Sequence, residues 1–222
     1  MTFAILALDE RTALIGCAAA TGNLAVGGWV LRAASKAGAV ATLGYSVSPI
    51  WGDEALSRLK EGESANGIVS ALTGVDTGRH HRQLAVLDRN GRSAAWTGKR
   101  NTDSKGHLSG EAFIVVGNWL SSLDVLHEMK HAFEDKKRSN SLTLGQRLLS
   151  TIEAGVAAGG DARGALSAAI RIVGSDRPPL DLRIDHDDQP IARLRSLYEL
   201  ATNPPYSDWT RDLPTLDDPY RC

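Results

Sequence analysis

Cysteine is scarce in this chain of 222 residues, and its scarcity excludes two structural classes. The two cysteines are Cys17, inside an apolar run, and Cys222, at the last position. Residues placed in this way support neither a disulfide framework nor a cysteine-based zinc site. We therefore predict a protein of the reducing cytoplasm.

An excess of charge of one sign is also lacking. Lys and Arg number 25 and Asp and Glu number 26, which leaves a formal net charge of −1. That balance removes the basic field with which nucleic-acid and anionic-membrane binders usually attract their partners. No apolar run is long enough to span a bilayer, and no phosphate-binding glycine loop or G-x-S-x-G elbow occurs. We predict a small-molecule substrate, no cofactor or metal, and neither nucleic acid nor membrane as partner.

The chain does contain a hydrophobic share of 42% and 22 glycines. The hydrophobic share is that of an ordinary globular protein, whereas glycine exceeds its usual ~7%. Many positions should therefore need tight turns or a close approach of two backbones. The length suffices for a single large domain with an extensive core.

Strands are predicted where short apolar runs end at turn residues. Residues 2–8 and 12–19 flank the turn residues Asp9 to Arg11 and predict a hairpin. Their apolarity is continuous rather than alternating, which indicates an inner layer covered on both faces. Asn90-Gly91 supplies the positive backbone angles of a second hairpin. Strands are further expected at residues 37–43, 83–88, 93–96, 113–116, 167–173 and 180–185.

Helices are predicted between these strands. Thr143-x-x-Gln146 is a capping box that opens one of them, and Gly159-Gly160 closes it. The others are expected at residues 53–60, 64–72, 121–133 and 190–200. Strands and helices follow one another without strict alternation, repeats or linkers. We therefore predict an α+β fold in one domain, residues 1–202.

Residues 203–222 have a different composition. Four of the eight prolines fall here, among Tyr206, Trp209 and Tyr220. Proline disfavours regular structure, and clustered aromatic residues seek a partner surface. We expect an extended arm that packs on its own domain or on a twin subunit, and hence a homodimer.

The segment His127-Glu128-Met129-Lys130-His131 matches the H-E-x-x-H motif of zinc metalloproteases, and Glu153 is a candidate third ligand. In a helix, however, the apolar stripe falls on Leu123, Leu126, Met129 and Phe133. Both histidines then lie on the far face with acidic residues. The pattern favours a solvated charged face over a zinc hydrolase.

Thr2 offers a different chemistry. If Met1 is removed, the hydroxyl of Thr2 lies next to a free α-amine. The pKa of such an amine is about 7.7–8.0, so part of it is neutral at pH 7 and can accept the hydroxyl proton. A threonine at position 2 is common, and its place at the start of an inner strand is what points to catalysis.

Short segments along the chain form a set. They are Thr2 to Ile5 with Ala19, Leu24 to Gly27, Pro49 to Gly52, Arg82 to Leu84, Thr97-Gly98, Gly117-Asn118, Ala158 to Gly164, Ser167 to Ala169 and Leu182-Arg183. Together they resemble the bacterial and archaeal domain-of-unknown-function 1028 family over roughly residues 1–200. Members of that family look like Ntn (N-terminal nucleophile) hydrolases, which are four-layer αββα sandwiches. The resemblance implies this architecture and leaves the substrate open.

The resemblance also implies roles for individual residues. Thr2 would attack an acyl carbon, and Asn118 would offer an amide N–H to the oxyanion. A strand-end asparagine that makes a turn remains the alternative for Asn118. Arg82 would bind an anionic substrate group or pair with a carboxylate. Asp161 and Arg163 would contact substrate or brace their loop as an ion pair.

Two departures from the family pattern bear on activity. The family typically has Ser-Lys where this chain has Thr21-Gly22, and a Gln where Leu166 precedes Ser167. A retained Met1 would in addition block the amine. Three hypotheses therefore stand: an amidohydrolase of a small non-peptide C–N amide, a non-catalytic binding or oligomeric protein of the same fold, and a zinc hydrolase through His127, Glu128 and His131.

Overall fold

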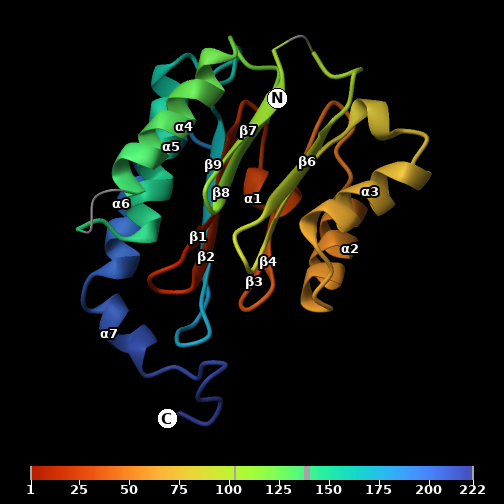
Figure 1. Ribbon diagram of the computed structural model, residues 1–222. Coiled ribbons are helices and arrows are strands. Elements are labelled where there is room, and N and C mark those ends of the chain that lie inside the picture. Colours follow the sequence, from red (N-terminus) through yellow and green to blue (C-terminus); the bar gives the residue numbers. More distant parts are fainter. Residues whose placement is uncertain (1, 103, 138–140, 222) are drawn as a thin grey trace.

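Two antiparallel β-sheets form the centre of the molecule (Figure 1). The computed structural model describes residues 2–102, 104–137 and 141–221. In the six-stranded sheet the order is β10 (Leu180–Ile184), β9 (Ser167–Val173), β2 (Leu14–Thr21), β1 (Thr2–Asp9), β8 (Phe113–Asn118) and β7 (Gly106–Gly110). In the four-stranded sheet it is β3 (Leu31–Ala34), β4 (Gly38–Leu43), β5 (Gln83–Asp88) and β6 (Ser93–Thr97).

The first hairpin is confirmed as β1 and β2, and both strands are buried along nearly their whole length. Phe3 and Ile5 of β1 belong to the core under the helices, whereas Ala4 and Leu6 belong to the core shared with the other sheet. Because neighbouring residues of a strand point to opposite faces, a strand buried on both faces has to be apolar throughout. The inner-layer prediction is therefore correct.

Helices lie on the outer faces of the two sheets (Figure 1). The helices α4 (Asp124–Lys137), α5 (Leu144–Ala157) and α6 (Pro190–Thr202) pack on the six-stranded sheet. The helices α2 (Pro49–Lys60) and α3 (Ala65–Val75) pack on the four-stranded sheet. Short turns of helix occur at α1 (Val26–Trp29), η1 (Arg79–His81) and α7 (Tyr206–Arg211). The fold is thus of the mixed α+β class, as predicted.

Two helices begin elsewhere than the sequence pattern indicates. The expected helix at 53–60 begins at Pro49, because Ser48 Oγ accepts a hydrogen bond from Trp51 N at 3.3 Å and proline fits the first helical turn. The expected helix at 121–133 begins at Asp124. The capping box of Thr143 and Gln146 at α5 is confirmed.

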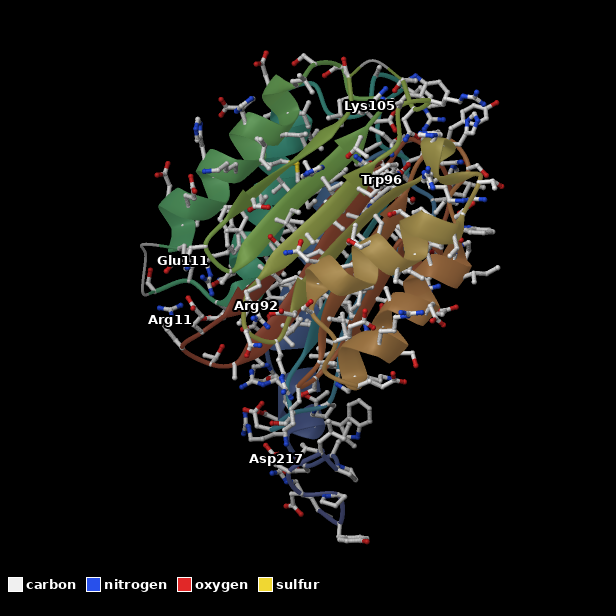
Figure 2. The ribbon with its side chains drawn as sticks, turned by 45° about the vertical axis from the view of Figure 1, so that its right-hand side comes forward. Arg11, Arg92, Trp96, Lys105, Glu111 and Asp217 are labelled. Atoms are coloured by element: carbon white, nitrogen blue, oxygen red, sulfur yellow. The ribbon has the colours of Figure 1, made fainter. Side chains whose placement is uncertain are left out.

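The C-terminal segment is less extended than expected, since Tyr206 to Arg211 form α7. Beyond α7 the chain is tied to its own domain. Asp217 accepts hydrogen bonds from Lys36 Nζ at 2.9 Å and from Ser175 Oγ at 2.7 Å. The segment nevertheless lies beyond the end of the sheets, as the position of Asp217 in Figure 2 shows. Within the described ranges no helix is both long and apolar enough to cross a membrane.

Candidate active site

Strand register brings three polar residues side by side at one end of the six-stranded sheet. Thr2 lies opposite Thr21 of β2 and opposite Asn118 of β8. Directly opposed residues of antiparallel strands point to the same face. For Thr2 this is the face of Ala4 and Leu6, which looks toward the other sheet. Thr2 and Asn118 are therefore adjacent, as the roles implied by the family resemblance require, and Met1 lies outside the described residues.

The three side chains differ in their access to solvent. Thr2 is half-buried, whereas Thr21 and Asn118 are each only 3% exposed. The hydroxyl of Thr2 donates a hydrogen bond to Thr21 Oγ1 at 3.1 Å. The group at the end of the strand is thus a half-buried threonine backed by a buried hydroxyl and a buried amide.

Gln83, from the opposite sheet, contacts this row and was not singled out by the sequence as a site residue. It is fully buried at the start of β5. Its Oε1 accepts a hydrogen bond from Asn118 Nδ2 at 2.9 Å, and its Nε2 donates to Gly117 O at 2.9 Å. A lone carboxamide in an otherwise apolar strand is the signal that could have indicated it.

Asp161 lies at the same end of the sheet. Its carboxylate accepts a hydrogen bond from Gly22 N, and its backbone forms a β-bridge with Leu120. Gly22 and Leu120 continue the two strands that flank β1, so Asp161 lies ahead of Thr2 between them. A Cβ on Gly22 would lie 2.7 Å from Asp161 Cγ. A side chain at position 22 would therefore require the Asp161 loop to move.

Arg163 and Trp119 form the outer edge of this region. Arg163 Nη2 lies 3.2 Å from Asp161 Oδ2, and the Asp161 side chain is fully buried. The Arg163 guanidinium also lies 5.0 Å from the centre of the Trp119 ring. Trp119 follows Asn118 directly and has a φ of 59°, a conformation rare outside glycine. The predicted Asp161–Arg163 ion pair is present, and Arg163 remains partly exposed.

Arg82 does not join the row by its side chain. Its Nε lies 2.7 Å from Asp76 Oδ2, its Nη1 donates to Ser46 O at 2.7 Å, and its guanidinium lies 5.9 Å from the Trp51 ring centre. Burial alone would raise the pKa of Asp76, but the hydrogen bonds from Arg82 and from Gly78 N hold that pKa below its ordinary value. The sequence left two roles open for Arg82, an anionic substrate group or a carboxylate partner, and its side chain pairs with the carboxylate of Asp76.

A zinc site would combine the two histidines of α4 with Glu153 of α5 as third ligand. His127, Glu128 and His131 are exposed, whereas Met129 and Phe133 are buried. Glu153, the candidate third ligand, is paired instead with Arg195, whose Nη2 lies 2.7 Å from Glu153 Oε2. Among the described residues no cluster of three His, Cys, Asp or Glu side chains is suited to a metal ion.

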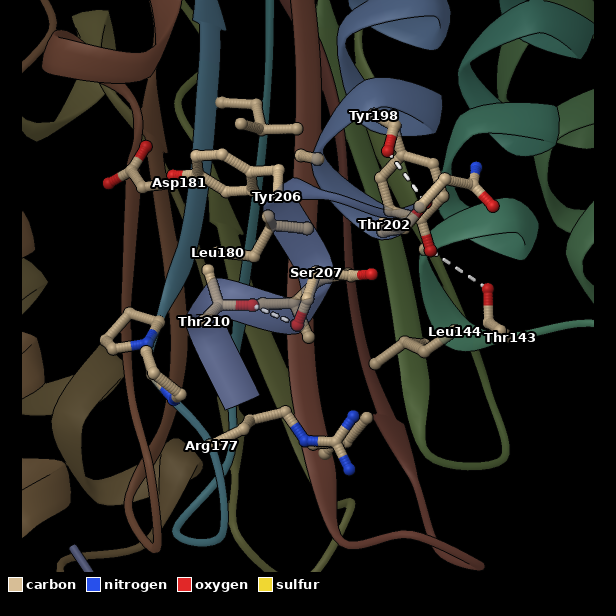
Figure 3. A pocket seen from close by; sticks show the side chains of 18 of the residues that line it. Thr143, Leu144, Arg177, Leu180, Asp181, Tyr198, Thr202, Tyr206, Ser207 and Thr210 are labelled. Carbon is tan, nitrogen blue, oxygen red and sulfur yellow. Dashed lines mark hydrogen bonds between the residues drawn. The ribbon is translucent and has the colours of Figure 1, made fainter. Parts of the chain in front are cut away.

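Two cavities lie away from the Thr2 row. The larger, of about 860 Å³, is bounded by α5, α6, α7 and the hairpin of β9 and β10. Figure 3 shows Tyr206 and Leu180 on one side of it, and Tyr198 hydrogen-bonded to Thr143 on the other. The smaller, of about 470 Å³, lies between the C-terminal segment and β3. Neither Thr2 nor Asn118 lines either cavity.

The fold and the Thr2 row define a mixed α+β protein of two antiparallel sheets, with hydroxyl and amide groups at the strand ends. Residues 2–194 match the model of the family of unknown function DUF1028, and the chain belongs to that family. It is similar to a protein of the same family from Silicibacter pomeroyi, known from its crystal structure. The identity is 44%, the TM-score is 0.93, and the match covers 99% of this chain and 98% of the other.

More distant similarities concern overall shape only. Eukaryotic HslV from Trypanosoma brucei shows a TM-score of 0.48 at 10% identity, over 76% of this chain and 98% of its own. Anbu, an ancestral beta-subunit from Yersinia bercovieri, shows 0.41 at 10% identity, over 90% and 94%. A search of curated proteins finds no match.

Proposed function

We propose that this protein is an Ntn-type amidohydrolase, built as a four-layer αββα sandwich, that cleaves a small non-peptide amide through an acyl-enzyme on Thr2. The observation that supports it is the position of the Thr2 hydroxyl. It lies at the accessible end of a central strand, hydrogen-bonded to Thr21 and opposite the buried amide of Asn118. A hydroxyl and an amide are the two groups that acyl transfer needs side by side.

In the proposed reaction the first step requires removal of Met1. The α-amine of Thr2, with a pKa of about 7.7–8.0, then accepts the proton of the Thr2 hydroxyl. The oxygen attacks the amide carbon, and the oxyanion that forms accepts a hydrogen bond from an N–H of Asn118. The C–N bond breaks, the amine leaves with the proton, and water hydrolyses the ester.

Asp161 and Arg163 support this reaction from the side of the amine. Asp161 contacts the residues that continue both neighbours of β1, so its carboxylate is suited to hold the Thr2 ammonium group in place. Because the Asp161 side chain is fully buried, we assign it to positioning rather than to substrate contact. Arg163, at the partly exposed edge, is the residue we assign to an anionic substrate group.

The test is the fate of Met1 and the effect of Thr2 on amide cleavage. Intact-mass measurement on protein from its native host should show a chain that begins at Thr2. Wild type, Thr2→Ala and the matched control Thr2→Ser are then screened against a library of small amides. We expect turnover to vanish in Thr2→Ala, to persist in Thr2→Ser, and to fall about 10²–10³-fold in Asn118→Ala. A retained Met1, or amide turnover unaffected by Thr2→Ala, contradicts the proposal.

A second candidate function is ligand binding without catalysis. It is favoured by the location of the two described cavities, which lie away from Thr2. Cavities of this size suit small organic molecules. Under this alternative the chain binds a ligand between α5, α6 and the hairpin of β9 and β10, and Thr2→Ala leaves binding unchanged.

A further inference from the structure

We infer that Gln83 is a positioning residue that sets the direction of the Asn118 carboxamide, an inference that rests on the proposed function. Gln83 belongs to the four-stranded sheet and Asn118 to the six-stranded sheet. The hydrogen bond between them therefore crosses the interior of the molecule at the level of Thr2. Lys105, labelled in Figure 2, immediately precedes β7 and marks the same end.

The hydrogen bonds of Gln83 leave only one orientation for its side chain. Its terminal group lies 3.0 Å from Gly106 O and 2.9 Å from Gly117 O. Carbonyl oxygens accept hydrogen bonds and never donate them, so the atom that faces them has to be the NH₂ nitrogen. The remaining atom, Oε1, then faces Asn118 and can only accept. These partners fix the assignment, which would otherwise be ambiguous for a carboxamide.

The same logic extends to Asn118. Because Gln83 Oε1 is an acceptor, the atom of Asn118 that faces it is Nδ2, at 2.9 Å. One N–H of Asn118 is thereby used, and its second N–H is held in a fixed direction by the planarity of the carboxamide. A rotation of Asn118 that exchanged its nitrogen and oxygen would set two oxygens against each other. Under the proposed function this second N–H faces the developing oxyanion, and Gln83 keeps the Asn118 oxygen from taking its place.

Gln83 is itself held in place by its surroundings. It is fully buried, and its Nε2 also lies 3.0 Å from Thr97 Oγ1. The two N–H groups of Nε2 are thus shared among acceptors on β6, β7 and β8. Rotation of the Gln83 carboxamide would set its oxygen against the carbonyl oxygens of Gly106 and Gly117, which is unfavourable away from water. The amide beside Thr2 is consequently oriented by residues that never contact substrate.

The experiment uses acetyl transfer from 4-nitrophenyl acetate, so it needs no knowledge of the natural substrate. Thr2 Oγ1 attacks the acetyl carbon, its proton passes to the α-amine, and 4-nitrophenolate leaves. Release of 4-nitrophenolate is followed by absorbance, the acetyl group is located by peptide mass spectrometry, and the rate of Thr2→Ala is subtracted. We compare Gln83→Met, Asn118→Ala, the double variant and Thr97→Val. Thr97→Val, the matched control, removes one acceptor of Gln83 without changing its contact to Asn118.

We expect Gln83→Met to slow Thr2 acetylation about 10-fold or more and Asn118→Ala to slow it ~10²-fold. The double variant should be no slower than Asn118→Ala alone, because Gln83 acts through Asn118. Thr97→Val should change the rate less than threefold. Independent losses that multiply in the double variant, or a Gln83→Met rate equal to wild type, overturn the inference.

A conservative variant separates orientation from loss of stability. In Gln83→Glu, a carboxyl oxygen still accepts a hydrogen bond from Asn118 Nδ2 in either protonation state, whereas Gln83→Met offers no such oxygen. Thr2 acetylation should therefore stay much closer to the wild-type rate in Gln83→Glu than in Gln83→Met, while circular dichroism shows both variants to be folded. Equal losses of rate in the two folded variants contradict the inference.

A further measurement remains informative if Thr2 is inert. Hydrogen exchange of the Asn118 side-chain amide, followed by nuclear magnetic resonance, should be slow in wild type and at least tenfold faster in folded Gln83→Met. Fast exchange in wild type, or equal exchange in both, refutes the orientation by Gln83. Absence of Thr2 acetylation in wild type, with slow amide exchange, refutes the proposed function and leaves the positioning of Asn118 intact.

Discussion

Asp9 and Arg147 form a buried ion pair at the end of β1 opposite to Thr2. The Arg147 side chain is 2% exposed, and its Nη2 lies 2.5 Å from Asp9 Oδ2. Burial alone would raise the pKa of Asp9, but Arg11 and Arg147 outweigh it and hold that pKa below its usual 3.8. The carboxylate therefore stabilises the fold above the pKa of the unfolded chain, and this contribution is lost as the pH falls through the lowered pKa.

We predict that Asp9→Asn lowers the free energy of unfolding at pH 7 by about 3–5 kcal/mol, because it leaves Arg147 charged and buried without its partner. Chemical denaturation at pH 7 and at decreasing pH measures this. The difference between variant and wild type should shrink as Asp9 becomes protonated. Arg11→Gln is the control, since Arg11 is 43% exposed and its loss should cost less than about 1 kcal/mol. Equal losses in both variants would contradict the assignment.

Cys17 lies between the two sheets and is fully buried. Burial raises the pKa of its thiol to about 12. We predict that Cys17 does not react with Ellman's reagent in the folded protein up to pH 9, and that it reacts once guanidinium chloride unfolds the chain. The measurement is made in Cys222→Ser, so that any signal comes from Cys17. Stoichiometric reaction under native conditions would show that this strand opens readily.

At the scale of single residues, the sequence indicates where Thr2 and Asn118 lie but not the network around them. Thr2 and Asn118 could be anticipated from their places at strand ends. Gln83 stands out as a lone carboxamide in an apolar strand, but its contact with Asn118 could not be anticipated, because no local pattern specifies how two sheets align. The ion pair of Asp161 with Arg163 is local and was anticipated, whereas the contact of Asp161 with Gly22 joins residues far apart in the chain.

At the scale of elements, α5 depends on its N-terminal cap. Thr143 Oγ1 accepts a hydrogen bond from Gln146 N at 3.3 Å and also lies 3.0 Å from the Tyr198 hydroxyl of α6. We predict that Thr143→Ala lowers the free energy of unfolding by about 1–2 kcal/mol through loss of the cap and of the link to α6. Thermal unfolding monitored by circular dichroism measures the loss, and Thr143→Ser should retain most of the stability.

Strand prediction succeeded where apolarity is continuous, and helix boundaries were less accurate. The hairpin at Asn90-Gly91 is confirmed, although only Gly91 of the pair has a positive φ, at 76°, and Asp88 accepts a hydrogen bond from Asn90 N. The start of α2 was placed too late, because the stretch before Asp53 is apolar and resembles a strand or loop. The start of α4 was placed too early, since Ser121 and Ser122 are both plausible caps.

At the scale of the whole molecule, the C-terminal segment exposes large apolar side chains. Trp209 is 56% exposed and Tyr220 is 91% exposed, although Asp217 ties the segment to the domain. Clustered exposed aromatic residues mark association surfaces. We predict a homodimer in light scattering at micromolar concentration, and a monomer after the combined change Trp209→Ser and Tyr220→Ser. A monomeric wild type at all concentrations contradicts this prediction.

The contact between Asp161 and Gly22 has a practical consequence for handling the protein. The backbone N–H of Gly22, beside the start of β1, is already hydrogen-bonded to the carboxylate of Asp161. A tag fused ahead of Thr2 would compete with this carboxylate for the Gly22 N–H, and it would acylate the nitrogen that the proposed reaction needs free. A handle at the carboxyl end avoids this conflict, because the two ends of the chain lie at opposite ends of the molecule (Figure 1), but it has to be removed before association through Trp209 and Tyr220 is measured.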